Sequence, residues 1–335
     1  MSAMKVLRAG PAMSIQDLGR SGFMARGLSH GGAADRAGLA EGAALLGQGL
    51  ELAAIEMAGM GGQFEVSEPT RIALTGAPMR AMLDDQPLVW NASHQMEPGQ
   101  ILSIGAAKKG IYGYLHVGGG FATELFLNSR ATHIVAGIGG LIQSDDSLEL
   151  SPDPRPDHVG LKLPPADRFD GGLVRILPSV QTAHFSQETR DRFQATAFSR
   201  TPRGNRQGAE LTFEGAPFAS QDQLGILSEP MVAGDIQMTG EGFPFVLLPE
   251  CQTTGGYPRI GTVLPDDLPR VAQATPGVEL KFQFISHEDA LLAHRSWAQQ
   301  VAEYAAHTQA LIRDPHEIAD LLSHQLISGM VDARR

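Results

Sequence analysis

The sequence predicts a mainly β protein of two domains, followed by a helical C-terminal segment. Short apolar segments separated by turn residues fill much of the chain, as expected for β-strands joined by tight turns. A stretch rich in proline and glycine, residues 151–172, divides the chain near its middle. After residue 285 the apolar residues recur at helical spacing. At 335 residues the chain is long enough for two domains.

The first predicted domain, residues 1–150, carries a series of strands. We expect them at 64–66, 71–75, 79–83, 100–104, 112–117 and 147–150. Residues 84–87 and 97–99 between them contain proline or glycine, which favour chain reversal, so the strands should pair antiparallel. One helix is predicted to begin after Asp35 as N-cap and to end at Gly47.

Residues 151–172 are predicted to be a linker, because their prolines and final glycines join neither a sheet nor a helix easily. The second domain, residues 173–285, starts with a strand at 173–177 and a short helix capped by Ser186. Further strands are expected around Leu211, Ile226 and Ile236, and at 245–248 and 280–285.

Residues 286–330 are predicted to form a helical hairpin. Apolar residues from Leu291 to Leu311 follow the spacing of one amphipathic helix. Asp314 then serves as the N-cap of a second helix, which ends at Gly329. Such an appendage usually serves packing or oligomerisation, so a homo-oligomer is left open.

Composition excludes several functional classes. The 26 Lys+Arg against 37 Asp+Glu give a net charge of −11, which argues against a nucleic-acid binder. No stretch resembles a signal peptide or a membrane span, so we expect a cytoplasmic protein that does not bind membranes. Cys251 is the only cysteine, and the histidines show no ligand spacing, so we predict no metal site.

Two glycine-rich stretches, residues 14–35 and 247–259, are the candidate functional loops. In the second, Gln252, Thr253 and Thr254 precede two glycines and Tyr257, and together they would present an amide, hydroxyls and backbone N–H groups to an anionic or amide ligand. We take these four side chains as candidate catalytic residues, with a hydrogen-bonded turn as the alternative. No Walker phosphate loop occurs, so a nucleotide would be held differently.

In the first stretch, the candidate substrate-binding residues are Gln16, Asp17, Arg20, His30 and Asp35. A mutual ion pair is the alternative for Asp17 and Arg20. An exposed loop histidine is the alternative for His30, and a helix cap is the favoured reading of Asp35.

These stretches resemble the allophanate hydrolase subunit 2 family, also described as biotin-dependent carboxyltransferase-like. The strongest matching piece is the Gln-Thr-Thr-Gly-Gly-Tyr-Pro run at 252–258, and the resemblance spans about residues 5–290. The other matching pieces are 16–20 with Gly22, 32–35, 74–77, Tyr114 with 117–120, 129–132, and Gly137 with 139–141.

The resemblance implies two cyclophilin-like β-barrel domains with a cleft between them. It also implies a homologous partner subunit of the allophanate hydrolase subunit 1 type and, in 5-oxoprolinases, a third subunit. Those enzymes open 5-oxo-L-proline to L-glutamate with ATP, which partner subunits would bind or share. Phosphorylation of the lactam carbonyl oxygen would need positive or N–H-rich groups around it. No Ala-Met-Lys-Met biotinylation site occurs, so biotin could arrive only on another protein.

The chain departs from the family pattern at positions that bear on the substrate. Where the family has Ser-Asp-Arg-Met-Gly, residues 204–208 keep the arginine as Arg206 but lose the acidic residue. Glu229 is followed by proline where the family has glycine. The proline that follows Gln237 in the family is replaced here. We take Arg206 and Glu229 as further candidate catalytic residues, since a guanidinium can clamp a carboxylate or phosphate, and Gln237 as substrate-binding. A structural ion pair and surface strand ends are the alternatives.

Three functions follow as hypotheses. The first is a hydrolase subunit that opens an amide or lactam with ATP, most simply of the type of the 5-oxoprolinase C subunit. The second is a carboxyltransferase that moves CO2 from carboxybiotin to urea or a related amide. The third is a regulatory binding protein without enzymatic activity, like the antagonist of a sporulation-kinase inhibitor. Cys251 is interpreted as a small buried apolar residue and not as a catalytic thiol.

Overall fold

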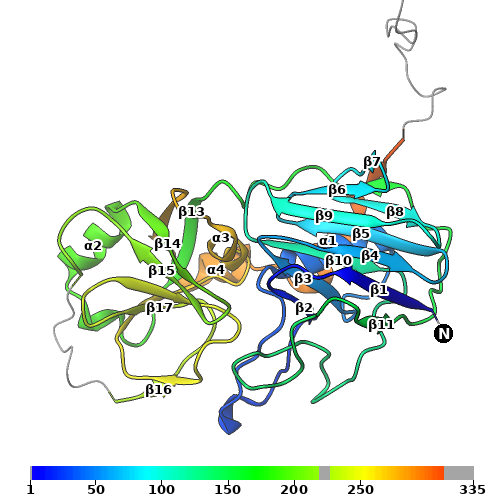
Figure 1. Ribbon diagram of the computed structural model, residues 1–335. Coiled ribbons are helices and arrows are strands. Elements are labelled where there is room, and N and C mark those ends of the chain that lie inside the picture. Colours follow the sequence, from blue (N-terminus) through cyan, green and yellow to red (C-terminus); the bar gives the residue numbers. More distant parts are fainter. Residues whose placement is uncertain (1, 219–226, 313–335) are drawn as a thin grey trace, which may run out of the picture.

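The computed structural model describes residues 2–218 and 227–312. The fold is mainly β, as predicted, and it comprises two β units that lie side by side with α3 (Leu268–Gln273) and α4 (His287–Ala293) near their junction (Figure 1). The first β unit consists of residues 2–162 with the strand at 309–310, and the second β unit consists of the described residues between 172 and 284. Among the described residues, no helix is both long and apolar enough to cross a lipid bilayer.

The first β unit contains two antiparallel sheets that pack face to face over one apolar core, which includes Phe64, Ile72 and Leu115. In spatial order, the six-stranded sheet has β11 (Ser147–Glu149), β1 (Ala3–Arg8), β4 (Gln63–Val66), β9 (Leu102–Ala107), β6 (Met79–Leu83) and β7 (Gln86–Pro87). The seven-stranded sheet has β2 (Met13–Gln16), β3 (Ala54–Ala58), β10 (Tyr112–Val117), β5 (Thr70–Gly76), β8 (Ala92–Met96), β12 (Leu161–Lys162) and β22 (Gln309–Ala310).

Helix α1 (Arg36–Leu46) covers the outer face of the seven-stranded sheet. Its N-cap is Asp35, whose side chain accepts the Gly38 N–H, and it ends at Gly47 in the left-handed conformation, as predicted. Two glycines let the helix approach the sheet, because a Cβ at Gly38 would lie 2.7 Å from the Tyr114 ring and one at Gly42 would lie 2.2 Å from a His116 ring atom. Close packing therefore explains glycines that otherwise weaken a helix.

The second β unit is a closed barrel of seven strands. In order around the barrel these are β13 (Gly172–Leu177), β20 (Arg259–Val263), β17 (Asp235–Met238), β18 (Pro244–Leu247), β15 (Gly208–Thr212), β14 (Phe198–Gly204) and β21 (Glu279–Phe284). Phe193 of α2 (Gln187–Ala195) packs at 4.8 Å from Phe198 and 5.4 Å from Phe282, measured between ring centroids, and fills the interior. The predicted cap Ser186 accepts the Thr189 N–H.

Smaller elements complete the fold. The strands β16 (Glu229–Pro230) and β19 (Thr254–Gly255) form a separate two-stranded ribbon. Two 3-10 turns lie at η1 (Met24–Arg26) and η2 (Thr182–His184), and α5 (Trp297–Ala306) packs against α1. The core is continuous across the junction, because Tyr112 and Tyr114 of the first unit belong to the same buried cluster as the barrel interior.

Two predictions about the connecting segments are wrong. The linker 151–172 does join a sheet, because β12 within it pairs with β8 and β22. The single helix expected from Leu291 to Leu311 is two helices and a strand: Ser296 starts α5 with a capping box to Gln299, and β22 follows. Local capping thus overrides the apolar spacing, and Leu291 is left 65% exposed. The predicted strand at Ile226 and helix at 314–329 lie outside the described residues.

Candidate active site

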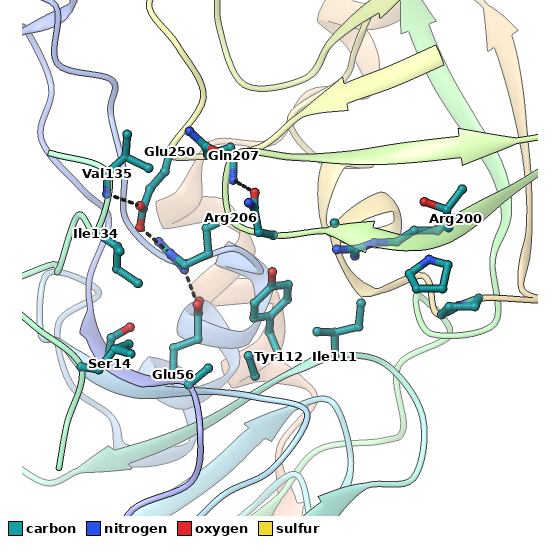
Figure 2. Close-up of a pocket in the computed structure, with 18 residues that line it drawn as sticks. Ser14, Glu56, Ile111, Tyr112, Ile134, Val135, Arg200, Arg206, Gln207 and Glu250 are labelled. Carbon is teal, nitrogen blue, oxygen red and sulfur yellow. Dashed lines mark hydrogen bonds and ion pairs between the residues drawn. The ribbon is translucent and has the colours of Figure 1, made fainter. Parts of the chain in front are cut away.

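A cleft of about 370 Å³ lies between the two β units (Figure 2). Apolar side chains such as Ile111, Ile134 and Val135 form much of its wall. Four charged side chains also line the cleft, namely Glu56 on β3, Arg200 on β14, Arg206 in the turn after β14, and Glu250 after β18. An apolar pocket with a few convergent polar groups is the usual form of a small-molecule site.

Arg206 makes three hydrogen bonds, two of which bridge the two units. Its Nε donates to Glu250 Oε1 at 2.6 Å, its Nη1 donates to Glu56, and its Nη2 donates to the Gly32 carbonyl oxygen at 2.5 Å. Burial alone would lower the pKa of Arg206, but Glu56 and Glu250 together outweigh burial and raise it. Arg206 is therefore a permanent cation whose charge is balanced by two carboxylates.

Each carboxylate has a second set of partners that fixes its position. Glu56 Oε2 accepts the Ala34 N–H at 2.8 Å and the Tyr114 hydroxyl at 2.7 Å. Burial, followed by the charges of Glu56 and Asp35, raises the pKa of Tyr114 well above its ordinary value, so the phenol stays a donor. Glu250 Oε2 accepts a backbone N–H of the segment 134–141 at 3.2 Å. The cluster is thus preorganised from both sides of the cleft.

Tyr112 lies in the middle of the cleft, with Arg206 toward one side and Arg200 toward the other (Figure 2). Burial and then the charge of Glu56 raise the pKa of Tyr112, whereas Arg200 and Arg206 partly offset the rise. Its hydroxyl therefore remains protonated at neutral pH and can donate a hydrogen bond to a ligand.

Ser29, His133 and Glu250 lie in a row like the serine, histidine and acid of a catalytic triad, but the histidine carries its proton on the wrong nitrogen. Ser29 Oγ lies 2.9 Å from His133 Nε2, and His133 Nδ1 lies 3.7 Å from Glu250 Oε2. The Ala136 N–H donates to His133 Nδ1 at 3.2 Å, which assigns the ring proton of the neutral histidine to Nε2. Nε2 then donates to Ser29 and cannot take its proton. The arrangement anchors a cleft wall and does not activate a serine.

The predicted residues Gln16, Asp17 and Arg20 all bond to the segment 126–132, which leads into a cleft wall. Asp17 and Arg20 do not pair with each other at ion-pair distance within the described residues. The bonds run from Gln16 Nε2 to Thr132 O (3.1 Å), from Arg130 N to Asp17 Oδ2 (2.6 Å) and from Arg20 Nε to Phe126 O (3.1 Å). None of the three side chains lines the cleft.

His30 and Asp35 do not line the cleft either. His30 bonds to Ser21 and Arg36, and burial followed by the Arg36 charge lowers its pKa to about 4. Asp35 is the N-cap of α1, and its Oδ2 accepts hydrogen bonds from Arg168 and from Gln273 Nε2, each at 2.7 Å. Because these bonds saturate a buried carboxylate, the geometry favours the capping role.

The second predicted group gathers at the ribbon β16–β19, outside the cleft lining. Gln252 Nε2 donates to Gln237 Oε1 at 3.0 Å, and Glu229 pairs with Arg259 at 2.5 Å. Thr253 contributes a carbonyl oxygen to the ribbon, and Thr254 and Tyr257 are exposed. Residues 14–35 contact the segment that precedes this group, because the Gly31 N–H donates to the Pro249 carbonyl oxygen at 2.9 Å. Their catalytic and binding roles stay predictions.

Sequence reasoning placed Arg206 among the candidates but missed Glu56, Tyr112, Arg200 and Glu250. Glu56 offers a signal, because it is the only charged residue in an otherwise apolar run from 52 to 60. A lone carboxylate there predicts a buried ion pair. Arg200 and Tyr112 offer no comparable signal, since their cleft positions depend on the way the two units meet.

Comparison with known proteins gives a consistent result. A family model described as "Carboxyltransferase domain, subdomain A and B" matches residues 26–284. The chain is 34% identical to the C subunit of 5-oxoprolinase from Haemophilus influenzae, over 84% of this chain and 91% of that protein. It is 32% identical to the C subunit of 5-oxoprolinase from Escherichia coli, over 87% of this chain and 94% of that protein.

Solved structures resemble the fold. The structure of the K. lactis urea amidolyase superposes with a TM-score of 0.81 at 22% identity, over 90% of this chain. The structure of TTHA0988 superposes with a TM-score of 0.76 at 29% identity, over 84% of this chain. The present chain spans 20% of the first and 56% of the second, so both are longer polypeptides that include a region of this fold.

Proposed function

The chain belongs to the carboxyltransferase domain family, and we propose that it is part of an ATP-dependent hydrolase, in the position of the 5-oxoprolinase C subunit. Together with partner subunits it would open 5-oxo-L-proline to L-glutamate. Two relatives above 30% identity bear the name of that 5-oxoprolinase component, and the chain covers more than nine-tenths of each. The partners are a homologous subunit, of the allophanate hydrolase subunit 1 type, and a third subunit.

The observation that carries the proposal is the cleft between the two units. Its volume of about 370 Å³ suits a small ring, and its apolar walls suit ring methylenes. In the proposed reaction the carbonyl oxygen of the lactam takes the γ-phosphoryl group of ATP and ADP leaves. Water then adds to the activated carbon, and the C–N bond breaks as the nitrogen takes a proton, which gives an acyl phosphate. A second water cleaves the acyl phosphate to glutamate and inorganic phosphate. The guanidinium groups at the cleft favour the negative charge that develops on oxygen, and Glu56 and Glu250 are the groups placed to accept protons.

We assign ATP to a partner subunit or to a site shared with it. A triphosphate needs several cations or a loop of backbone N–H groups, whereas the cleft is lined by two arginines, one of which is already held by two carboxylates. The sequence also has no Walker lysine loop. In this proposal both β units are cyclophilin-like domains, and the enzyme works in the cytoplasm, where ATP is at hand.

The test is reconstitution. The full chain is purified with its candidate partner subunits, and 5-oxoproline-dependent ATP hydrolysis and glutamate formation are measured together. We expect turnover only with the complete set, its loss in Arg206→Ala, and its retention in Arg203→Ala, whose side chain is an exposed neighbour. Absence of turnover with every partner set would overturn the proposal.

A carboxyltransferase is the second candidate, favoured by the description of the family model and by a putative urea carboxylase of Emericella nidulans that is 25% identical over 90% of this chain. Free carboxybiotin with urea or related amides would reveal it as carboxylation without ATP. A regulatory binder without activity predicts instead a stable partner complex that survives both Gln252→Ala and Arg206→Ala.

A further inference from the structure

Arg200 is a buried cation without a carboxylate partner in the part of the chain that the structure describes. Its exposed fraction is 4%, and it lines the cleft. Its Nη1 donates to the Ala272 carbonyl oxygen at 2.8 Å, and no ion pair joins it to an acidic residue of the described ranges. Arg206, in the same cleft, has two carboxylate partners. A buried charge is unfavourable unless a counter-charge lies near it. The cleft should therefore bind an anion favourably at Arg200.

The local backbone holds the Arg200 guanidinium in place. The pairing of β14 with β15 shifts register between Arg200 and Gly204, a strand irregularity of the kind that redirects a side chain. A Cβ on Gly204 would lie 2.5 Å from Arg200 Nη2, so glycine leaves the space that the guanidinium occupies. Pro202 and Pro276 also line the cleft, and their rings fix the local backbone. The position is therefore built into the barrel.

Arg200 and the Arg206 cluster lie toward opposite sides of Tyr112 (Figure 2). The cleft thus has one end with a single unpaired guanidinium, a middle with a phenol hydroxyl and apolar walls, and another end where a guanidinium is held by two carboxylates. A ligand with an anion at one end and a polar reacting group at the other matches this order.

We propose that Arg200, assisted by the Tyr112 hydroxyl, binds the carboxylate of the substrate and so selects small cyclic amides that carry one carboxylate. A planar guanidinium can grip a carboxylate through two parallel hydrogen bonds. The ring then lies along Ile111, and the lactam carbonyl group reaches toward Arg206. This inference rests on the proposed function and deepens it, because neutral urea would gain nothing from Arg200.

The assembled enzyme tests the inference with two substrates that share a ring, 5-oxo-L-proline and 2-pyrrolidinone, which lacks the carboxylate. In Arg200→Met we expect the KM for 5-oxoproline to rise about tenfold or more, as for loss of a charged hydrogen-bond partner, with a smaller change in kcat. The KM for 2-pyrrolidinone should stay unchanged, Arg200→Lys should recover part of the loss, and the exposed Arg203→Met is the matched control.

A second variant keeps the inference testable if Arg200→Met does not fold. Gly204→Ala keeps the charge but displaces the guanidinium, and we expect it to raise the same KM selectively. Equal KM changes for both substrates, or none for 5-oxoproline, would overturn the inference while leaving the proposed function intact. If no partner set gives turnover, calorimetric binding of 5-oxoproline to the full chain decides: binding lost in Arg200→Met supports the inference, and binding that is unchanged or absent in wild type overturns it.

Discussion

Replacing Arg206 by methionine should destabilise the protein strongly, because it removes the cation that joins the two β units. Methionine keeps much of the side-chain length but leaves Glu56 and Glu250, which are 3% and 1% exposed, without their shared partner. Removing one member of a buried charge cluster typically costs about 3–5 kcal/mol, since the carboxylates left behind stay desolvated.

The structure places the expected loss inside that range. Arg206 makes three bonds, and hydrogen bonds to charged groups contribute roughly 1.5–3 kcal/mol each, so their simple sum would exceed the range. Glu56 keeps the Ala34 N–H and the Tyr114 hydroxyl, and Glu250 keeps a backbone N–H, which limits the loss. We expect about 4 kcal/mol and a thermal midpoint lower by on the order of 10 °C.

The assay is thermal and urea unfolding followed by circular dichroism, with Arg203→Met as the control for loss of an exposed arginine. The control should change stability by less than about 0.5 kcal/mol. Adding Glu56→Gln and Glu250→Gln to Arg206→Met should restore a large part of the stability, because the stranded charges are gone. A loss below about 1 kcal/mol in the single variant, or a triple variant no more stable than it, would refute the reasoning.

Three further predictions concern residues away from the cleft charges. Burial lowers the pKa of His116 from its ordinary value of 6.5 to about 3. Between these two pKa values the unfolded state binds more protons than the folded state, so stability falls as the pH falls. Acidification from pH 7 to 5 should cost about 2 kcal/mol, and His116→Asn should lose less stability over the same range. Burial, then the Asp235 charge, raises the pKa of the Cys251 thiol to about 12, so Cys251→Ala should retain turnover and the native thiol should react slowly with a disulfide reagent at pH 8; fast labelling would contradict this. Gly42→Ala should lower the urea midpoint by the equivalent of about 1–3 kcal/mol because its Cβ would meet the His116 ring, despite a helix-propensity gain of about 1 kcal/mol; a stabilised variant would contradict the packing.

The sequence predicted best the elements whose signals are local. The strands β5 and β10 are apolar runs bounded by turn residues, and α1 begins and ends at its expected caps. Strand β2 was missed, because Ser14 and Gln16 make it look like a polar loop. Both side chains are buried, and Gln16 bonds to a carbonyl group 116 residues away, a contact that no local pattern encodes.

The residues of the candidate site also differ in how far the sequence alone could identify them. Arg206 was found through the family resemblance, because residues 204–208 keep the arginine of that motif, but its partner Glu56 is 150 positions away in the sequence. The run 252–258 drew attention through its hydroxyl groups and glycines, yet the barrel turns it toward the ribbon, and only the adjacent Glu250 reaches the cleft. Which of two neighbouring residues faces a cleft depends on how separate units dock, and that is set by tertiary packing.

The pairing of β22 with β12 constrains how the molecule can move. The barrel leaves the first β unit after Lys162 and its chain returns at Gln309, directly opposite Lys162 in the sheet. The barrel is therefore connected at both ends to one sheet edge. Tyr304 packs in the apolar cluster beside this edge, together with Leu161 and Leu163. Both chain crossings between the units start from this edge, so a rigid-body rotation of the barrel would pivot there.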